Sequence, residues 1–275
     1  MFVQDVMGDG DDATSDAIIV FGANGAEVGQ LVQVTGLVTE FVPGGTRTGN
    51  QPTTEIVNPS YTVIASNQEL PAVIEIGARG RLLPTSTHSD SIYFWESLEA
   101  MRVKLVRPTA VSATYRGDTF VRAADQVTSI SERGTLNIGP TDFNPERILI
   151  AGAGVSVDVG VVLEDVIDVV SYGFGEYKII FSELSFVKEP STLVPTRTTL
   201  SKKDSSLLIG SYNVLNLDIS DNTATGRFAL IARHIISNMG GPDIVALQEV
   251  QDNDGSTNSA ITTASDVLQT LTDEI

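Results

Sequence analysis

Residues 207–215 read LLIGSYNVL and residues 244–249 read IVALQE, and these two runs decide the fold of the C-terminal part of the chain. Each run is mostly apolar and has the length of a strand, which suits a sheet covered on both faces. The segment between them predicts an amphipathic helix of about four turns, because its apolar residues recur at helical spacing. Those residues are Phe228, Ile231, Ala232, Ile235, Ile236 and Met239. Thr225 is a candidate N-cap, and Gly240-Gly241-Pro242 ends the helix.

Strand, helix and strand with short connections form a βαβ unit, whose strands run parallel and end at the same edge of the sheet. Asn213 and Asn216 close the first strand, and Glu249 closes the second. We therefore expect these side chains to share one rim. A carboxylate at that position suits a hard cation such as Mg²⁺, and a neighbouring amide can orient it without adding charge. The alternative is a strand-end glutamate that faces water.

The motifs around this rim resemble the opening motifs of the endonuclease/exonuclease/phosphatase superfamily. The resemblance rests on SYNVLNL (211–217), GRFALIA (226–232) and PDIVALQEVQDNDG (242–255). It implies that Glu249 binds Mg²⁺ or Mn²⁺ and that Asn213 is an active-site residue near the scissile phosphate. Many members carry an acid two residues after the first-motif Asn, where this chain has Leu215, so no ligand role is expected there.

The same resemblance implies that residues 207–275 are the N-terminal part of an α/β four-layer sandwich. It also requires a downstream Asp-x-Asn motif and an Asp-His pair, which do not occur before Ile275. We therefore expect a chain truncated at both ends, and a fragment that is inactive alone. The two histidines, His88 and His234, are interpreted as structural or solvent-facing.

Residues 1–187 predict a β-rich module, because short Val- and Ile-rich segments alternate with Gly, Pro, Asn and Asp. The module resembles the oligonucleotide-binding (OB) fold that precedes the catalytic domain in bacterial secreted nucleases. A weak repeat of residues 28–32 at 159–163 favours two lobes, 1–97 and 98–187, unless it is only a common way to enter a strand. Residues 188–206 have the composition of a linker. The expected fold class is thus mixed β and α/β.

An acidic turn near the N-terminus is a second candidate metal site. Asp9, Asp11, Asp12 and Asp16 crowd one Gly-containing loop. Clustered carboxylates repel one another unless they are solvated or bridged, and oxygen-rich loops suit Ca²⁺. The spacing is not that of an EF-hand, so a structural Ca²⁺ site and a solvated turn both remain open.

Composition limits the possible partners. The net charge is −18, which works against non-specific binding of nucleic acid. Any nucleic acid must be held by a metal or by a local basic face, such as one formed by Arg102 and Lys104 with Tyr93 or Trp95 nearby, unless that face is only solvated. Cysteine is absent, so disulfides are excluded, and no apolar run is long enough to span a membrane.

Three functions remain open at this stage. The first is a secreted or periplasmic nuclease that uses Mg²⁺ or Mn²⁺, with its signal peptide lost by truncation. The second is a phosphodiesterase of the same superfamily that acts on lipid headgroups. The third is a non-catalytic OB-like binding or adhesion module, which the acidity and the Thr-rich β-structure would also fit. DNA and RNA are not distinguished, nor are endo- and exonucleolytic cleavage.

Overall fold

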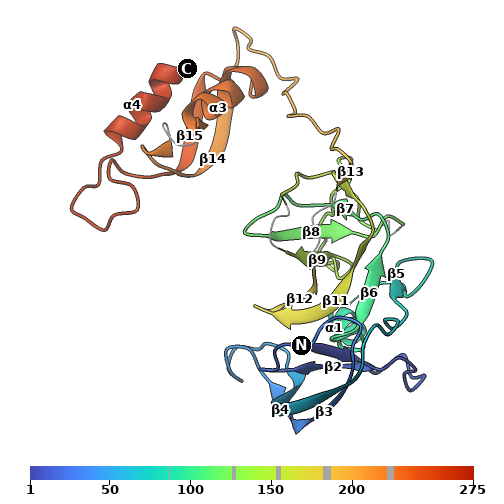
Figure 1. Cartoon of the computed structure of the whole chain (residues 1–275). Helices are drawn as coiled ribbons and strands as arrows, with labels where there is room; N and C mark the ends of the chain where they lie inside the picture. Colours follow the sequence, from blue (N-terminus) through green and yellow to red (C-terminus); the bar gives the residue numbers. More distant parts are fainter. Residues whose placement is uncertain (86, 126–127, 153–155, 182–186, 222–225) are drawn as a thin grey trace. The chain divides into compact units, whose positions relative to one another are not determined.

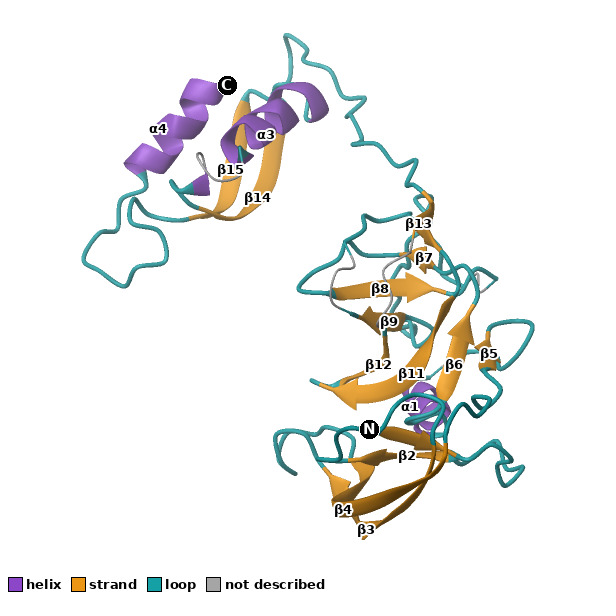
Figure 2. Ribbon diagram, in the orientation of Figure 1, coloured by secondary structure: helices purple, strands orange, loops and turns teal. Residues whose placement is uncertain are grey.

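The computed structural model describes residues 1–85, 87–125, 128–152, 156–181, 187–221 and 226–275. The chain divides into two compact units, Met1–Leu193 and Val194–Ile275. The fold is mixed but mainly β-sheet, with few helices (Figure 2).

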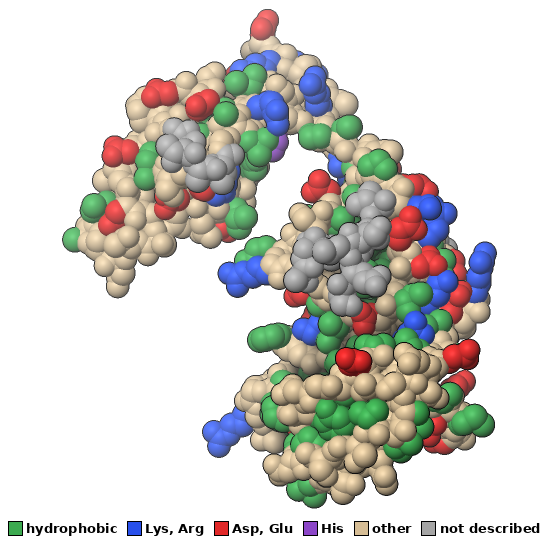
Figure 3. Space-filling model, viewed as in Figure 1, with side chains coloured by type: hydrophobic (Ala, Val, Ile, Leu, Met, Phe, Trp, Pro, Cys, Tyr) green, Lys and Arg blue, Asp and Glu red, His purple; other side chains and the backbone are tan. Residues whose placement is uncertain are grey.

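The N-terminal unit begins with a four-stranded sheet in the order β1-β2-β4-β3 (Figure 1). Its strands are β1 (Phe2–Gln4), β2 (Ala17–Val20), β3 (Leu31–Phe41) and β4 (Thr53–Ala65). β3 and β4 form a long antiparallel hairpin, and β2 runs parallel to β4. Several apolar side chains of this hairpin stay exposed, among them Leu37 and Val38 (Figure 3).

The second sheet of this unit has nine strands and curls into a half-barrel. Their order is β13-β10-β7-β8-β9-β12-β11-β6-β5. The bounds are β5 (Ile74–Ile76), β6 (Arg102–Leu105), β7 (Thr109–Ala110), β8 (Asp118–Arg122), β9 (Ile148–Ala151), β10 (Val162–Leu163), β11 (Val166–Gly173), β12 (Glu176–Ile180) and β13 (Val187–Glu189).

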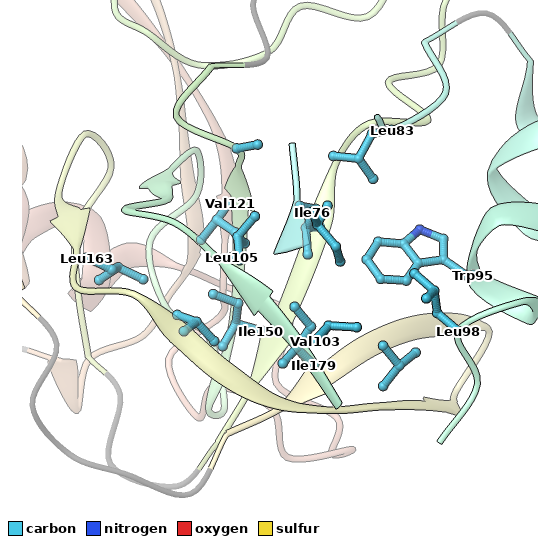
Figure 4. Packing of buried hydrophobic residues seen from close by; sticks show 14 of the residues in the cluster. Ile76, Leu83, Trp95, Leu98, Val103, Leu105, Val121, Ile150, Leu163 and Ile179 are labelled. Atoms are coloured by element: carbon cyan, nitrogen blue, oxygen red, sulfur yellow. The ribbon is translucent and has the colours of Figure 1, made fainter. Parts of the chain in front are cut away.

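The main hydrophobic core lies inside this curled sheet and is closed by helix α1 (His88–Glu96). Thr87 caps α1, because its side chain accepts a hydrogen bond from the backbone N–H of Asp90 at 3.1 Å. Trp95 and Leu98 pack beside inward-facing strand residues such as Val103 (Figure 4). Burying each of these large side chains contributes about 1.5–3 kcal/mol relative to exposure.

The C-terminal unit contains the expected βαβ arrangement. β14 (Ile209–Leu217) runs parallel to β15 (Ile244–Val250), with Asn213 opposite Gln248. The connection is α3 (Arg227–Arg233) followed by a π-helical turn, η1 (His234–Asn238), and α4 (Ser265–Glu274) follows β15. The helices cover one face of the strand pair and enclose a small core that includes Val214 and Phe228.

Some expectations differ from the structure. The predicted lobe boundary at residues 97 and 98 does not follow the sheets, because β5 and α1 precede it but pack with the second sheet. α1 itself was missed, since its apolar residues do not form a clear stripe. The helix after β14 ends in a π-helical turn, and its candidate cap Thr225 lies outside the described residues.

The apparent sequence repeat reflects two similar glycine turns. Gly29 and Gly160 both adopt a positive φ, 84° and 83°, just before a strand. The strands that follow differ, since β3 has 11 residues and pairs with β4, whereas β10 has 2 and pairs with β7 and β13. The sequences at 28–32 and 159–163 therefore share a glycine turn before a strand, and they do not mark two similar lobes.

The two sheets of the N-terminal unit meet at a buried carboxyl group, that of Glu99. Glu99 Oε2 accepts a hydrogen bond from Thr54 N at 3.1 Å, and the Glu99 carbonyl accepts one from Ser15 Oγ at 2.6 Å. Burial raises the pKa of Glu99 to about 7; the Thr54 hydrogen bond opposes this shift, and the charges of Glu96, Glu40 and Glu55 add to it. This side chain is only 7% exposed, so its ionisation places a charge at the junction.

We predict that the stability of the N-terminal unit falls as the pH rises from about 4.5 to 7. In this range the native state binds more protons than the unfolded state, because the native pKa of Glu99 lies above its ordinary value. The loss should be about 2 kcal/mol once solvent screening is allowed for. Glu99→Gln should remove most of this dependence and stabilise the unit at pH 8.

Urea unfolding followed through the fluorescence of Trp95, the chain's one tryptophan, measures this at pH 5 and pH 8. Glu69→Gln, at an exposed position, is the matched control and should keep the wild-type pH dependence. Equal pH dependence in the Glu99→Gln and wild-type proteins would show that another group controls the junction.

Candidate functional site

The carboxyl ends of β14 and β15 form the candidate site, which we call the rim: Asn213, Leu215, Asn216, Glu249 and Gln251. Asn213 Nδ2 donates a hydrogen bond to Glu249 Oε1 at 2.6 Å. Gln251 Nε2 donates one to Asn216 Oδ1 at 2.8 Å. The prediction that Asn213, Asn216 and Glu249 share one edge is therefore confirmed, and it follows from the parallel register of the strands.

The orientation of the Asn213 amide is fixed from both sides. Its oxygen accepts a hydrogen bond from the backbone N–H of Leu215 at 2.8 Å, which leaves its nitrogen to donate to Glu249. Glu249 Oε2 has no hydrogen-bond partner among the described residues. Asn213 thus holds one carboxylate oxygen in place and leaves the other available to a cation.

The backbone of the rim takes conformations that L-residues rarely adopt. Leu215, Asn216 and Glu249 have φ values of 48°, 53° and 59°. A left-handed conformation at a non-glycine residue costs about 1 kcal/mol or more, and such residues concentrate at functional sites. In this case the conformation turns the strand ends so that Asn213 and Glu249 meet.

Arg227, at the start of α3, holds this irregular end of β14. Its Nη2 donates to the carbonyls of Val214 and Leu215, the second at 2.8 Å, and its Nη1 pairs with Asp221. A cation at a helix N-terminus is unfavourable with respect to the helix dipole, so its presence there points to another role. A cation at the start of a predicted helix is the one feature of the sequence that indicates a role for Arg227.

A group of acids follows Glu249 in the chain. Asp252 shares a hydrogen bond with Asp254, which raises the pKa of Asp252, and burial adds to the effect. Asp218 instead accepts the backbone N–H of Ser220 at 2.7 Å, and this hydrogen bond lowers its pKa. Within the described ranges, no three His, Cys, Asp or Glu side chains are grouped as metal ligands.

The rim nevertheless fits a hard divalent cation. Mg²⁺ keeps most of its water ligands and is often held by only one or two carboxylates, which a single exposed Glu249 can supply. Leu215 is 70% exposed and offers no ligand, in line with the departure seen in the sequence. Together with Asn213, the rim can bind and orient a hydrated cation at a solvent-facing edge.

The acidic loop of the N-terminal unit is organised by its own backbone. Asp9 Oδ1 accepts Asp11 N at 2.8 Å, Asp11 Oδ1 accepts Ala13 N at 2.9 Å, and Asp16 Oδ1 accepts Asp9 N at 3.0 Å. Such Asp turns explain part of the enrichment in acids. Asp12 is exposed, and Ca²⁺ binding by this loop stays a prediction.

The predicted basic face is already occupied by partners within the protein. Arg102 and Lys104 do share one side of β6, as their alternation indicated. Lys104 pairs with Asp165 at 2.8 Å, and Arg102 donates to the carbonyl of Pro71 at 3.2 Å. Trp95 is 4% exposed, so it belongs to the core and offers no face on which a base could stack.

The two histidines, expected to be structural or solvent-facing, differ in their surroundings. His88 is exposed at the first position of α1. His234 is half-buried, and its Nδ1 lies 2.7 Å from the hydroxyl oxygen of Tyr212. Among the described residues no helix is long and apolar enough to cross a membrane, and the absence of cysteine excludes disulfides.

Comparisons with known proteins identify a family but no function. No curated protein matches the chain, and no solved structure matches it. One family model matches residues 49–190, which is more than half of the chain and contains every strand of the nine-stranded sheet. The rim lies outside the matched segment. The chain belongs to the family described as a domain of unknown function, DUF8508.

Proposed function

We propose that this chain is part of a divalent-metal-dependent phosphodiesterase that acts on nucleic acid, with Glu249 as the ligand of Mg²⁺ or Mn²⁺. The observation that carries the proposal is the hydrogen bond from Asn213 to Glu249 at the ends of two parallel strands. The left-handed backbone of Leu215, Asn216 and Glu249 supports it, because a fold keeps such conformations where the resulting geometry has a use.

The two side chains would have different roles. Glu249 supplies the charged ligand, and Asn213 is a positioning residue that keeps one carboxylate oxygen occupied. A bound divalent cation polarises a phosphoryl oxygen and lowers the pKa of a bound water. Arg227 would act indirectly, because it donates hydrogen bonds to the Val214 and Leu215 carbonyls and so fixes the backbone of the rim.

We further propose that the two units correspond to an OB-like β-module and to the first strands of an α/β sandwich. The curled nine-stranded sheet and the parallel βαβ unit support these assignments. A β-module joined to such a rim favours nucleic acid over lipid headgroups as the substrate, by analogy only. Its site of action would be extracellular or periplasmic.

We predict that Mn²⁺ binds at the rim and that Glu249→Gln abolishes this binding. Glutamine keeps the oxygen that accepts the Asn213 hydrogen bond and loses only the charge, so the rim should remain folded. In backbone amide NMR spectra, substoichiometric Mn²⁺ should broaden the signals of residues 213–217 and 248–251. Asn213→Ala should weaken the binding several-fold through the loss of orientation.

Glu274→Gln, at an exposed glutamate near the end of α4, is the matched control and should leave the broadening unchanged. The same spectra report on the Asp9–Asp16 loop of the other unit, which should keep its own response in the Glu249 variant. Wild-type broadening at residues 213–217 in the Glu249→Gln protein would place the metal elsewhere.

We also predict that these 275 residues do not cleave DNA or RNA when Mg²⁺ is added. Cleavage of a phosphodiester needs an activated nucleophile and stabilisation of the transition-state charge as well as a metal ligand. The described rim offers one carboxylate and one amide for this purpose. A longer chain in which Asp-x-Asn and Asp-His motifs follow should cleave, and its Glu249→Gln variant should lose most turnover.

Fluorescently labelled single- and double-stranded DNA and RNA, incubated with Mg²⁺ or with a chelator, distinguish these outcomes. Robust Mg²⁺-dependent cleavage by the 275 residues would show that the catalytic groups lie at another site. Unchanged turnover in the Glu249→Gln form of the longer chain would lead to the same conclusion.

A further inference from the structure

A cavity in the C-terminal unit is lined by basic side chains, although the unit itself is acidic. The cavity has a volume of about 480 Å³ and lies between residues 194–197 and the end of the α3–η1 helix. The described residues that line it include no Asp or Glu; they are Val194, Pro195, Arg197, Arg233, His234, Ser237 and Asn238. Across residues 194–275, acids outnumber Lys and Arg by ten to five.

Acids among the described residues do not pair with the two arginines of this cavity. In the part of the unit that the structure describes, ion pairs join Lys202 to Asp243, at 2.9 Å, and Arg227 to Asp221. Arg197 and Arg233 form no ion pair with any residue that the structure describes. Arg233 lies in the last turn of α3, where a cation complements the helix dipole, but the dipole does not account for Arg197.

The walls of the cavity are held by hydrogen bonds. Thr198 N donates to the Asn238 carbonyl at 2.8 Å, and Asn238 Nδ2 donates to the Thr196 carbonyl at 2.9 Å. These two bonds fix the segment that carries Arg197 against η1, which carries Ser237 and Asn238. η1 is itself a π-helical turn, a rare irregularity that is frequent at functional sites. Arg197 and Arg233 are distant in the sequence, and the fold places both of them in the lining of one cavity.

His234 can add a neutral donor to the same cavity. Its Nδ1 lies 2.7 Å from the hydroxyl of Tyr212, and burial raises the pKa of Tyr212, so this phenol keeps its proton. When Tyr212 donates to Nδ1, the ring proton of a neutral His234 sits on Nε2. Arg197, Arg233, His234 and Ser237, which all line this cavity, thus carry side-chain groups that can donate hydrogen bonds.

We propose that this cavity is an oxyanion site, which takes a phosphate group either as a free ion or in a phosphodiester chain. Guanidinium groups match the geometry of phosphate oxygens, and arginines that form no ion pair with a described residue are available to bind an anion. The volume of about 480 Å³ lies in the range of small-molecule sites and is enough for a phosphate group. Tyr212 points to the helices while Asn213 is exposed, so the cavity is separate from the rim.

Binding measured without divalent metal tests this site independently of the proposed function. With a chelator present and at low salt, inorganic phosphate should shift the amide NMR signals of residues 197 and 233–238. A fluorescein-labelled ten-nucleotide thymidine strand, followed by anisotropy, tests the phosphodiester source. Arg197→Gln and Arg233→Gln should each weaken phosphate binding at least five-fold, and the double variant should abolish it. Arg197→Lys should retain part of it.

Lys203→Gln is the matched control, because this exposed lysine does not line the cavity. Tighter binding of the oligonucleotide than of phosphate, lost in the same variants, would assign the site to a phosphodiester chain. Phosphate binding without oligonucleotide binding would assign it to the free ion. The proposal is overturned if neither probe binds, or if the double variant binds as well as the wild type. None of these outcomes depends on Glu249.

Discussion

The candidate site depends on one constraint, the parallel pairing of β14 with β15. Parallel strands in one sheet require a crossover, which α3 and η1 provide, and they place both carboxyl ends at the same edge. Asn213 and Glu249, 36 residues apart, meet for this reason. The strand direction places the two residues at one edge. The left-handed backbone and the hydrogen bonds of Arg227 then shape the end of β14 at that edge.

The same crossover produces the basic cavity on the helix-covered side. The helix returns along the strands and brings its last turn beside residues 196–198, which hydrogen-bond to it. Tyr212 and Asn213 are neighbours in β14 and point to opposite faces of the sheet. Tyr212 therefore contacts His234 beside the cavity, whereas Asn213 contacts Glu249 at the rim. The rim that we propose for a cation and the cavity that we propose for an anion therefore lie at different places in one unit.

The N-terminal unit is built on a different principle, a curled sheet closed by a single helix. Its weak point is the junction between the two sheets, where Glu99 is buried among other acids. The backbone N–H of Thr54 donates a hydrogen bond to the Glu99 carboxyl group, and the Ser15 hydroxyl donates one to the Glu99 backbone carbonyl. Because a buried carboxyl with a raised pKa favours its neutral form, we expect the docking of the sheets to depend on the protonation of Glu99.

Sequence by itself determined the βαβ order, the β-rich character of residues 1–187 and the shared rim, because these follow from hydrophobic periodicity and from the geometry of parallel strands. It did not show α1, whose burial comes from the sheet around it and not from its own pattern. The tertiary structure alone decided that Asn213 orients Glu249, that Arg227 holds β14 and that Arg197 lies with Arg233 in one cavity. Such contacts depend on side-chain direction and on residues distant in the chain, which periodicity does not encode.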